Sequence, residues 1–369
     1  MSEDKVNCLA GRSCLPSTAV MEMTYRCNHE CLYCSCPWEA PASAPHEPYA
    51  KEEELSTEKW KSILTALTKE HDCCHLAFTG GETLLKEGLE ELLRHVVSLK
   101  ARFPVVDDGP LRFEDKTPEI YVLSNGRLMS DKWLDIFAEL KVHLSLSLPG
   151  LSAFADHTGH DTSQRVLDWM KKASEREIPL TANVTVTKKN LGELFETLSQ
   201  AFLHGADMLL MNRFMPGGRG LAHADELVLS AEEVLQMCEI ADEVLQLSNR
   251  PGSLGTELPL CVLQGKTFEK LQVGTRCSAA KEFFVIDPSG FIRCCNHSPI
   301  RIVHWDEVDK LAEHPYWRRF VERDYLPDQC FECSLMTECD GGCREAAHVQ
   351  KGSVTAEDPL WDPSMIVRD

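Results

Sequence analysis

The chain has 369 residues, of which 43% are hydrophobic and 17 are cysteines, and its formal net charge is −20. This length allows more than one domain, and because the sequence shows neither a membrane-spanning apolar stretch nor an export signal, we expect a cytoplasmic protein. The acidic balance argues against a nucleic-acid partner, whose phosphates would be repelled.

Apolar, strand-like runs alternate with helical periodicity over the first 225 residues. Six strands are predicted at residues 18–24, 74–79, 120–123, 142–148, 180–186 and 208–211. Helices are predicted near residues 56–70, 85–96, 130–140, 162–177 and 191–204. Such repeats indicate parallel strands joined by right-handed crossovers. Because a full barrel needs eight repeats, the pattern predicts a six-stranded open (β/α)6 barrel over roughly residues 15–225.

Two stretches rich in proline and charge interrupt this alternation, residues 37–54 and 101–118. We expect both to be surface loops near the barrel mouth, where they could shape a substrate entrance. Beyond the barrel, Ser230 and Glu233 have capping-box spacing and predict a helix to about Leu247. Residues 226–260 are therefore a predicted helical bridge to a second domain over residues 261–369.

Three cysteines follow the first predicted strand with the spacing Cys-x3-Cys-x2-Cys, namely Cys27, Cys31 and Cys34. This spacing supplies three thiolates to a four-iron cluster and leaves the fourth iron open to a small molecule. The first loop after a strand is also where parallel α/β folds hold reactive groups. The alternative is a zinc site, but zinc favours four protein ligands in Cys-x2-4-Cys pairs.

The three-cysteine motif, followed by Gly80-Gly81-Glu82 after the second predicted strand, resembles the radical SAM superfamily. In that family the open iron binds S-adenosylmethionine, which is cleaved reductively to an adenosyl radical. The resemblance implies that Gly80 and Gly81 allow close backbone approach to the cofactor and that the Glu82 carboxylate receives the methionine ammonium. It also implies that Tyr33 lies against the adenine.

Ser147, at the end of the fourth predicted strand, matches the family's polar contact to the cofactor, although it could be an ordinary strand-terminal serine. Many relatives carry an arginine some residues further on. Here that region is Asp156-His157-Thr158-Gly159-His160, so the contact to the methionine carboxylate stays unassigned.

The last third of the chain carries a second cysteine pattern. Residues 286–290 predict a hairpin turn, and four residues separate Gly290 from Cys295. The run Cys330-x2-Cys333-x5-Cys339-x3-Cys343 follows. Together these features resemble the SPASM domain, over roughly residues 255–345. In certain radical SAM proteins this extension binds two auxiliary iron–sulfur clusters, so the resemblance implies three [4Fe-4S] clusters in all.

The resemblance also implies how the cysteines divide. The first auxiliary cluster would be held by Cys261, Cys277, Cys295 and Cys343, and the second by Cys330, Cys333 and Cys339. Cys294 competes with Cys295, which fits the family spacing better. The family's usual final cysteine is absent, so either an oxygen or nitrogen ligand completes the second cluster or one iron stays open. The candidates in the tail are His348, Asp358 and Asp362.

The other cysteines have weaker signals. Cys73, Cys74 and Cys238 lie in apolar surroundings and are expected in the core. Cys36 is two residues from Cys34 and could lie near its cluster. A last pair near the N-terminus, Cys8 and Cys14, has no strong pattern.

Radical SAM enzymes with SPASM domains usually act on ribosomally made peptides or protein side chains, and their auxiliary clusters accept an electron. The resemblance therefore implies an oxidoreductase that cross-links a precursor peptide through a C–C or C–S bond. Its expected partners are that peptide, a flavodoxin- or ferredoxin-type electron donor and, if the barrel mouth does not grip the peptide, a separate leader-binding protein.

Three alternative functions remain at this point. One is radical oxidation or rearrangement of a small molecule, and another is a non-enzymatic iron–sulfur electron carrier. The third is formylglycine formation in sulfatases, which depends on an aspartate directly after a cluster cysteine. Here Cys294 is followed by Cys295, and Cys295 by Asn296, so this base is missing.

Overall fold

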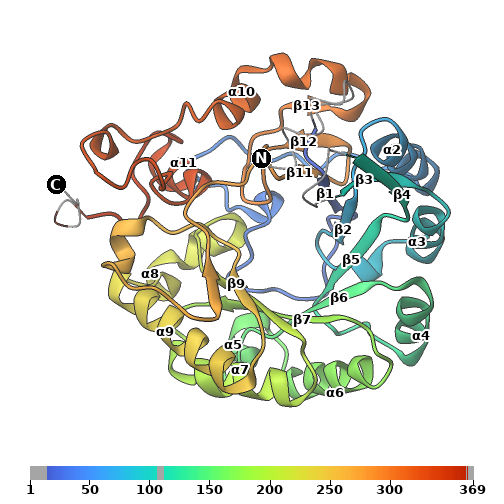
Figure 1. The fold of residues 1–369 in the computed structure, drawn as a ribbon, viewed down its shortest axis with the longest axis horizontal. Coiled ribbons are helices and arrows are strands. Elements are labelled where there is room, and N and C mark those ends of the chain that lie inside the picture. Colours follow the sequence, from blue (N-terminus) through green and yellow to red (C-terminus); the bar gives the residue numbers. More distant parts are fainter. Residues whose placement is uncertain (1–14, 106–111, 363, 365–369) are drawn as a thin grey trace.

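The computed structural model describes residues 15–105, 112–362 and 364. All six predicted strands are present, as β1 (Thr18–Glu22), β2 (His75–Thr79), β5 (Glu119–Ser124), β6 (His143–Ser147), β7 (Leu180–Val186) and β8 (Met208–Arg213). The helices between them are α2 (Thr57–Lys69), α3 (Leu89–Val97), α4 (Asp131–Leu140), α6 (Ser163–Ser174) and α7 (Leu194–Leu203). The strands surround the centre and the helices lie outside them (Figure 1). This arrangement confirms the predicted α/β open barrel.

The sheet continues beyond the six predicted strands at both edges. At one edge, β9 (Gly252–Leu254) and β10 (Leu271–Val273) follow β8 in parallel. At the other edge, β11 (Phe283–Ile286) pairs in parallel with β1, and the antiparallel strands β12 (Phe291–Arg293) and β13 (Val303–His304) extend it. In the described part of the chain the order is β10-β9-β8-β7-β6-β5-β2-β1-β11-β12-β13. The C-terminal third thus supplies both edges of the sheet that the first 225 residues begin.

Short helical segments connect the barrel elements. They are the 3₁₀ helices η1 (Pro37–Glu39), η2 (Thr83–Leu85), η3 (Leu191–Glu193) and η4 (Gly218–His223), and the α-helices α5 (Phe154–Thr158) and α8 (Ala224–Leu227). The helix predicted near residues 85–96 begins later, at Leu89. The reason is that Gly88, in the left-handed region with φ of 75°, separates α3 from η2.

The two interrupting stretches differ from each other. Residues 37–54 are irregular apart from η1, as expected of a loop. The loop predicted over residues 101–118 is wrong in part, because β3 (Ala101–Val105) and β4 (Arg112–Lys116) pair as an antiparallel ribbon. Residues of β4 are mostly exposed, so this strand lacks the apolar alternation by which a half-buried strand is recognised.

The predicted bridging helix is α9 (Ala231–Ser248), and its capping box is present. Ser230 Oγ accepts a hydrogen bond from the Glu233 N–H at 3.2 Å, and the Glu233 carboxylate accepts one from the Ser230 N–H at 2.7 Å. The predicted hairpin turn is also confirmed, with Gly290 at φ of 97° between β11 and β12. The remaining helical segments are η5 (Leu260–Leu263), η6 (Trp305–Glu313), α10 (Pro315–Val321), η7 (Asp328–Cys330) and α11 (Arg344–Lys351).

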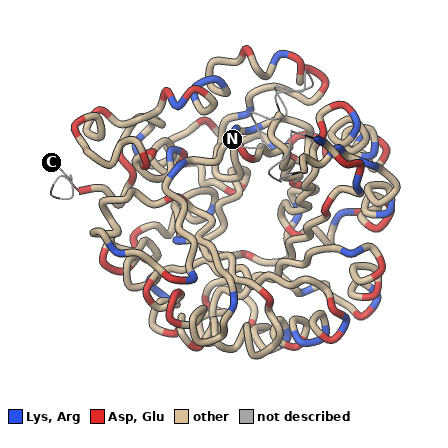
Figure 2. The backbone as a smooth tube through the Cα atoms, viewed as in Figure 1, with Lys and Arg blue, Asp and Glu red and all other residues tan. Residues whose placement is uncertain are grey.

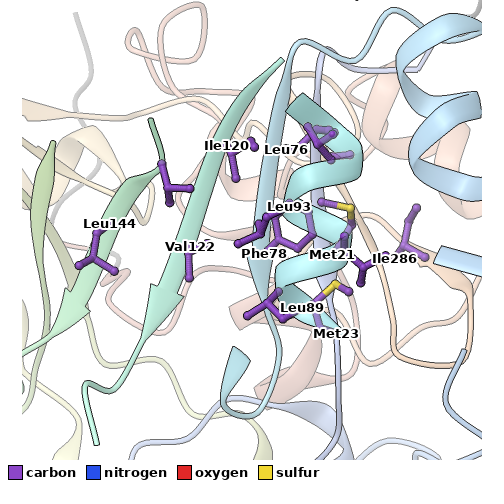
Figure 3. Packing of buried hydrophobic residues seen from close by; sticks show 14 of the residues in the cluster. Met21, Met23, Leu76, Phe78, Leu89, Leu93, Ile120, Val122, Leu144 and Ile286 are labelled. Atoms are coloured by element: carbon purple, nitrogen blue, oxygen red, sulfur yellow. The ribbon is translucent and has the colours of Figure 1, made fainter. Parts of the chain in front are cut away.

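The main core lies between the sheet and the outer helices. Met21, Phe78 and Val122 come from three neighbouring strands and are all fully buried. They belong to the same cluster as Leu93 of α3, which covers them (Figure 3). Ile286 of β11 joins this cluster, so the C-terminal strand shares its core with the barrel. A second cluster packs α7 and α9 against β7 and β8.

Charged residues lie mainly on the outer ring of helices, where acidic and basic side chains are interspersed (Figure 2). Among the helices in the described residues, none combines the length and apolar character needed to cross a bilayer.

Candidate active site

A cavity of about 550 Å³ lies inside the ring, at the carboxyl ends of the parallel strands. Polar side chains from six consecutive strands of the sheet line it: Glu22, Thr79, Ser124, Ser147, Asn183 and Asn212. Parallel α/β barrels place their reactive groups at this end, because the loops that follow the strands converge there.

The three cysteines of the first motif line this cavity from the loop that follows β1. Backbone hydrogen bonds hold the loop in place. The Leu32 N–H donates to the His157 carbonyl at 2.8 Å, and the Gly220 N–H donates to the Cys34 carbonyl at 3.1 Å. Cys36 lines the same cavity, with its sulfur 3.9 Å from the Gly80 carbonyl oxygen. The structure therefore brings Cys27, Cys31 and Cys34 together and places Cys36 beside them.

The pKa values of the three thiols shift in different directions, because burial raises that of Cys27 whereas a hydrogen bond with Cys36 lowers that of Cys34. Burial, followed by the neighbouring sulfurs of Cys34 and Cys27, raises the pKa of Cys31 to about 12. A thiol with so high a pKa keeps its proton at neutral pH unless a metal replaces it. No three Cys, His, Asp or Glu side chains of the described ranges are grouped as a single metal ion would require. The cysteines instead surround a space, as ligands of a larger group do.

The Gly80-Gly81-Glu82 turn packs directly against the cysteine loop. A Cβ atom on Gly81 would lie 2.1 Å from the Arg26 carbonyl oxygen, and one on Gly80 would lie 2.8 Å from the Thr24 oxygen. The Gly81 N–H donates to the Thr24 oxygen and the Glu82 N–H to the Arg26 oxygen, each at 2.8 Å. Both glycines are thus required by close backbone packing, whatever else approaches them.

The Glu82 side chain is 1% exposed and bonds to the end of β5 and to its own turn. Its carboxylate accepts hydrogen bonds from Ser124 Oγ at 2.8 Å, the Asn125 N–H at 2.8 Å and the Leu84 N–H at 3.0 Å. Burial raises the pKa of Glu82. The carboxylate has room for one further donor, so the predicted ammonium contact would add to a structural role that the sequence did not indicate.

Tyr33 and Ser147 both line the cavity. The Tyr33 ring packs edge-on against His157, with ring centroids 5.5 Å apart, and Ser147 pairs with Asn183 on the next strand. His157 itself is buried, with Nδ1 2.8 Å from the Pro149 oxygen and Nε2 2.9 Å from Thr187 Oγ1. The cofactor contacts of Tyr33 and Ser147 remain predictions.

Cys277, Cys295 and Cys343 line the same cavity as the first motif. Burial raises the pKa of all three thiols, to about 12 for Cys343. Cys294 does not line the cavity, since its fully buried side chain belongs to the hydrophobic core. The structure thus favours Cys295, as the spacing did.

Cys261 does not lie with this group, so the predicted division of the cysteines is corrected here. A second, smaller pocket is lined by four cysteines: Cys261, Cys330, Cys333 and Cys339. Next to Cys261, the Leu260 N–H donates to Cys339 Sγ at 3.4 Å. Burial and then the sulfur of Cys339 raise the pKa of Cys261 to about 12. The sequence could not show this grouping, because it depends on how η5 folds back onto a segment far away in the chain.

The three predicted tail ligands are engaged elsewhere. The Asp358 carboxylate bonds to Arg213 and to the Cys343 N–H, and His348 Nδ1 lies 2.9 Å from the Glu345 carboxylate. Exposed Asp362 accepts hydrogen bonds from Ser364. With Cys261 present, the second pocket needs none of them.

The remaining cysteines were expected in the core or had no clear role. Cys73, Cys74 and Cys238 are buried, as expected. Cys8 and Cys14 lie outside the described residues.

Sequence reasoning missed the loop after β8, which supports the first motif. Gly218 has φ of 49°, and a Cβ there would lie 2.3 Å from the Cys36 oxygen and 2.7 Å from the Cys34 oxygen. The adjacent residues Pro216 and Gly217 pack on His297, which also lines the cavity. The Pro-Gly-Gly signal after the sixth strand could have identified this turn.

An open parallel barrel with three cysteines after β1 and a Gly-Gly-Glu turn after β2 defines a radical SAM protein. Residues 21–201 match the model of the radical SAM superfamily, as the sequence resemblance implied. The chain is therefore a radical S-adenosylmethionine enzyme, with an oxidoreductase-type reaction.

Similar curated proteins include two named PqqA peptide cyclase. The one from Rhodopseudomonas palustris is 26% identical over 94% of this chain and 86% of its own length. The one from Granulibacter bethesdensis is 22% identical over 93% of this chain and 86% of its own length.

Solved structures of two proteins share the fold. Streptococcus suis SuiB bound to S-adenosylmethionine has a TM-score of 0.65 at 15% identity, covering 93% of this chain and 76% of its own. The structure titled native anSMEcpe with bound AdoMet has a TM-score of 0.65 at 17% identity, covering 92% of each chain.

Proposed function

We propose that this enzyme oxidatively cross-links a side chain of a ribosomally made precursor peptide and that it binds three [4Fe-4S] clusters. One observation carries the proposal. Cys27, Cys31 and Cys34 line the same cavity as Cys277, Cys295 and Cys343, so a substrate between them would face both groups. A separate group, Cys261, Cys330, Cys333 and Cys339, would hold the third cluster.

The residues fit such groups. The thiols of Cys31, Cys261 and Cys343 have pKa values raised to about 12, so cation binding would replace their protons. The buried Arg213 Nε has no hydrogen-bond partner among the described residues, and Arg213 lines the cavity beside Cys343. When bound by the first motif, a cluster and S-adenosylmethionine would supply the 5′-deoxyadenosyl radical.

The chain's own residues would orient the cofactor and the peptide. Ser147, Asn183 and Asn212 offer neutral polar groups to the cavity, and Tyr33 offers an aromatic face. At the turn between β11 and β12, residues 37–54 pack against the barrel. There the Tyr49 hydroxyl donates to Asp287 Oδ2 at 2.5 Å. This segment would form one wall of the peptide entrance.

A peptide substrate is supported by the relatives' names. PqqA peptide cyclases are named for acting on a peptide, and one SuiB structure, with a TM-score of 0.69 at 14% identity, is described as bound to the precursor peptide SuiA. A flavodoxin- or ferredoxin-type donor would deliver electrons, and the second pocket suits such exchange because Cys330 and Cys333 are only half-buried. A separate leader-binding protein is a further partner that we propose.

Formylglycine formation is less well supported. The residue after Cys295 is Asn296, whose side-chain amide lies 3.4 Å from the Glu22 carboxylate. An amide that donates to a carboxylate cannot serve as the general base that this reaction needs.

Mass spectrometry of the product tests the proposal. The reduced holoenzyme, incubated with S-adenosylmethionine and a candidate precursor peptide, should release 5′-deoxyadenosine and a product lighter by about two hydrogens. Replacing Cys27, Cys31 and Cys34 together by alanine should abolish both and leave the iron of the auxiliary groups in place. A product of unchanged mass, or formylglycine from a sulfatase peptide, would contradict cross-linking. Turnover of a small molecule alone would favour the second candidate, radical oxidation or rearrangement.

A further inference from the structure

We propose that the carboxylate of Glu257 is the fourth protein ligand of the iron–sulfur cluster held by Cys277, Cys295 and Cys343. This inference rests on the proposed function, because it assumes that these cysteines hold a cluster. It replaces the role that the sequence assigned to Cys261, which belongs to the other group.

The position of Glu257 is fixed by the segment that joins β9 to η5. The Leu258 N–H donates to the carbonyl of Gly274, the residue that follows β10, at 3.0 Å. This hydrogen bond anchors the segment beside the end of β10. Glu257 lines the cavity shared by the three cysteines, whereas Cys261, four residues later, lines the second pocket. One short segment therefore contributes a side chain to each cysteine group.

The Glu257 carboxylate lies next to Cys277. Its Oε1 accepts a hydrogen bond from the Ser278 N–H at 3.1 Å, and Ser278 directly follows Cys277. The Cys343 thiol lines the same cavity as this carboxylate. Besides Ser278 and its own backbone N–H, the carboxylate has no hydrogen-bond donor within the part of the chain that the structure describes.

No cation pairs directly with this carboxylate, although the charges of Arg213 and Lys281 act to lower its pKa. Within the described ranges, Glu257 forms no salt bridge. The neighbouring Arg213 guanidinium is paired with Asp358 and reaches Glu257 only at its backbone oxygen, at 3.4 Å. Burial raises the pKa of Glu257. A buried carboxylate that faces three thiols without a directly paired cation is costly, and coordination to iron would offset that cost.

Two other candidates for this position, Glu345 and Cys294, are engaged elsewhere. Glu345 also lines the cavity, but its Oε1 accepts the Tyr316 hydroxyl at 2.7 Å and its Oε2 lies 2.9 Å from His348 Nδ1. Cys294 is buried in the hydrophobic core. Both Glu345 oxygens thus have side-chain partners, whereas the Glu257 carboxylate accepts from backbone N–H groups alone.

Spectroscopy of iron-loaded protein tests the assignment. We would use the full chain with Cys27, Cys31 and Cys34 changed to alanine, so that only the auxiliary groups contribute, and label it with ⁵⁷Fe. An oxygen-ligated iron differs from its thiolate-ligated neighbours, so the parent should show a distinct iron subsite in its Mössbauer spectrum. Glu257→Cys should keep the iron content and lose that distinct subsite. Glu257→Ala should leave the subsite open, so that added imidazole shifts its signal but not that of the parent.

Glu345→Gln is the matched control and should leave the spectrum of the parent unchanged. The assignment is overturned if Glu257→Ala or Glu257→Cys has the parent's spectrum, or if Glu345→Gln removes the subsite instead. If Glu257→Ala does not fold, the Glu257→Cys spectrum decides alone. A parent whose iron is accounted for by Cys261, Cys330, Cys333 and Cys339 alone would contradict the proposed cluster at Cys277, Cys295 and Cys343, and with it the proposed function.

Discussion

Arg213 at the end of β8 and Asp358 after α11 form a bidentate ion pair, with Nη1–Oδ1 at 3.1 Å and Nη2–Oδ2 at 2.5 Å. The two side chains are 4% and 0% exposed. Asp358 also accepts the Cys343 N–H at 2.8 Å, and Arg213 donates to the Glu257 carbonyl at 3.4 Å. The pair thus ties the barrel to the segments on which Cys343 and Glu257 lie.

Breaking this pair from one side should destabilise the protein strongly. Asp358→Leu leaves the Arg213 guanidinium buried without its partner, for which we expect a loss of about 3–5 kcal/mol in the free energy of unfolding. The double variant Arg213→Met/Asp358→Leu should lose less than the sum of the two single variants, since no unpaired charge remains. Anaerobic urea unfolding of the iron-loaded protein measures these values. Additive losses would show that the two residues act independently.

Gly81→Ala should disrupt the first cysteine loop, because a Cβ at residue 81 would lie 2.1 Å from the Arg26 oxygen. The backbone must then move away from residues 23–27, and we expect the variant to lose the iron bound by the first motif while it keeps that of the auxiliary groups. Gly192→Ala is the matched control, since nothing lies within 4 Å of a Cβ at that position. Iron counting on both variants checks this. Full iron content in Gly81→Ala would show that the turn can adapt.

The barrel could be predicted because its signals are local. Each apolar run and each helical period lies within a few residues, and the motif Cys-x3-Cys-x2-Cys is held in one loop. The pairing of β1 with β11 could not be predicted in this way. Thr18 pairs with Phe283, and most of the chain lies between these two residues in the sequence. The same limit applies to Cys261, whose partners are set by tertiary folding and not by spacing.

The β3–β4 ribbon was missed for another reason. Most residues of β4 are charged and exposed, and β3 is largely half-buried, so burial did not impose an apolar alternation on them. For Glu82, the sequence indicated that the residue is important but not what its carboxylate binds within the protein. The motif identified it correctly as a special residue, but only the structure shows that its carboxylate anchors Ser124 and Asn125.

His157 should make the stability of the protein depend on pH. Burial lowers its pKa from the ordinary value of 6.5, so the folded state binds fewer protons than the unfolded state. Its stabilising contribution is therefore complete above pH 6.5 and is lost as the pH falls toward the lowered pKa of the folded state. His157→Gln should reduce the melting temperature at about pH 7.5 more than at about pH 5. A difference between the two proteins that stays constant with pH would contradict this prediction.

Glu82→Gln should weaken cofactor binding without removing iron. An amide offers one oxygen where the carboxylate accepts three hydrogen bonds, so one donor among Ser124, Leu84 and Asn125 would face an NH₂ group. A charge-assisted hydrogen bond to the methionine ammonium would also be lost, at about 1.5–3 kcal/mol, so affinity for S-adenosylmethionine should fall by about ten- to a hundredfold.

Two further measurements separate these effects. Ser124→Ala removes one donor to Glu82 and keeps the charge, so it should lower stability but change affinity far less than Glu82→Gln. Because burial raises the pKa of Glu82, binding by the unaltered enzyme should also weaken as the pH falls through that raised value and the carboxylate takes up a proton. Anaerobic calorimetric titration measures the affinity of the unaltered enzyme and of both variants for S-adenosylmethionine, and urea unfolding measures the stability of Ser124→Ala. Normal affinity in Glu82→Gln would limit Glu82 to the structural role that its three hydrogen bonds already define.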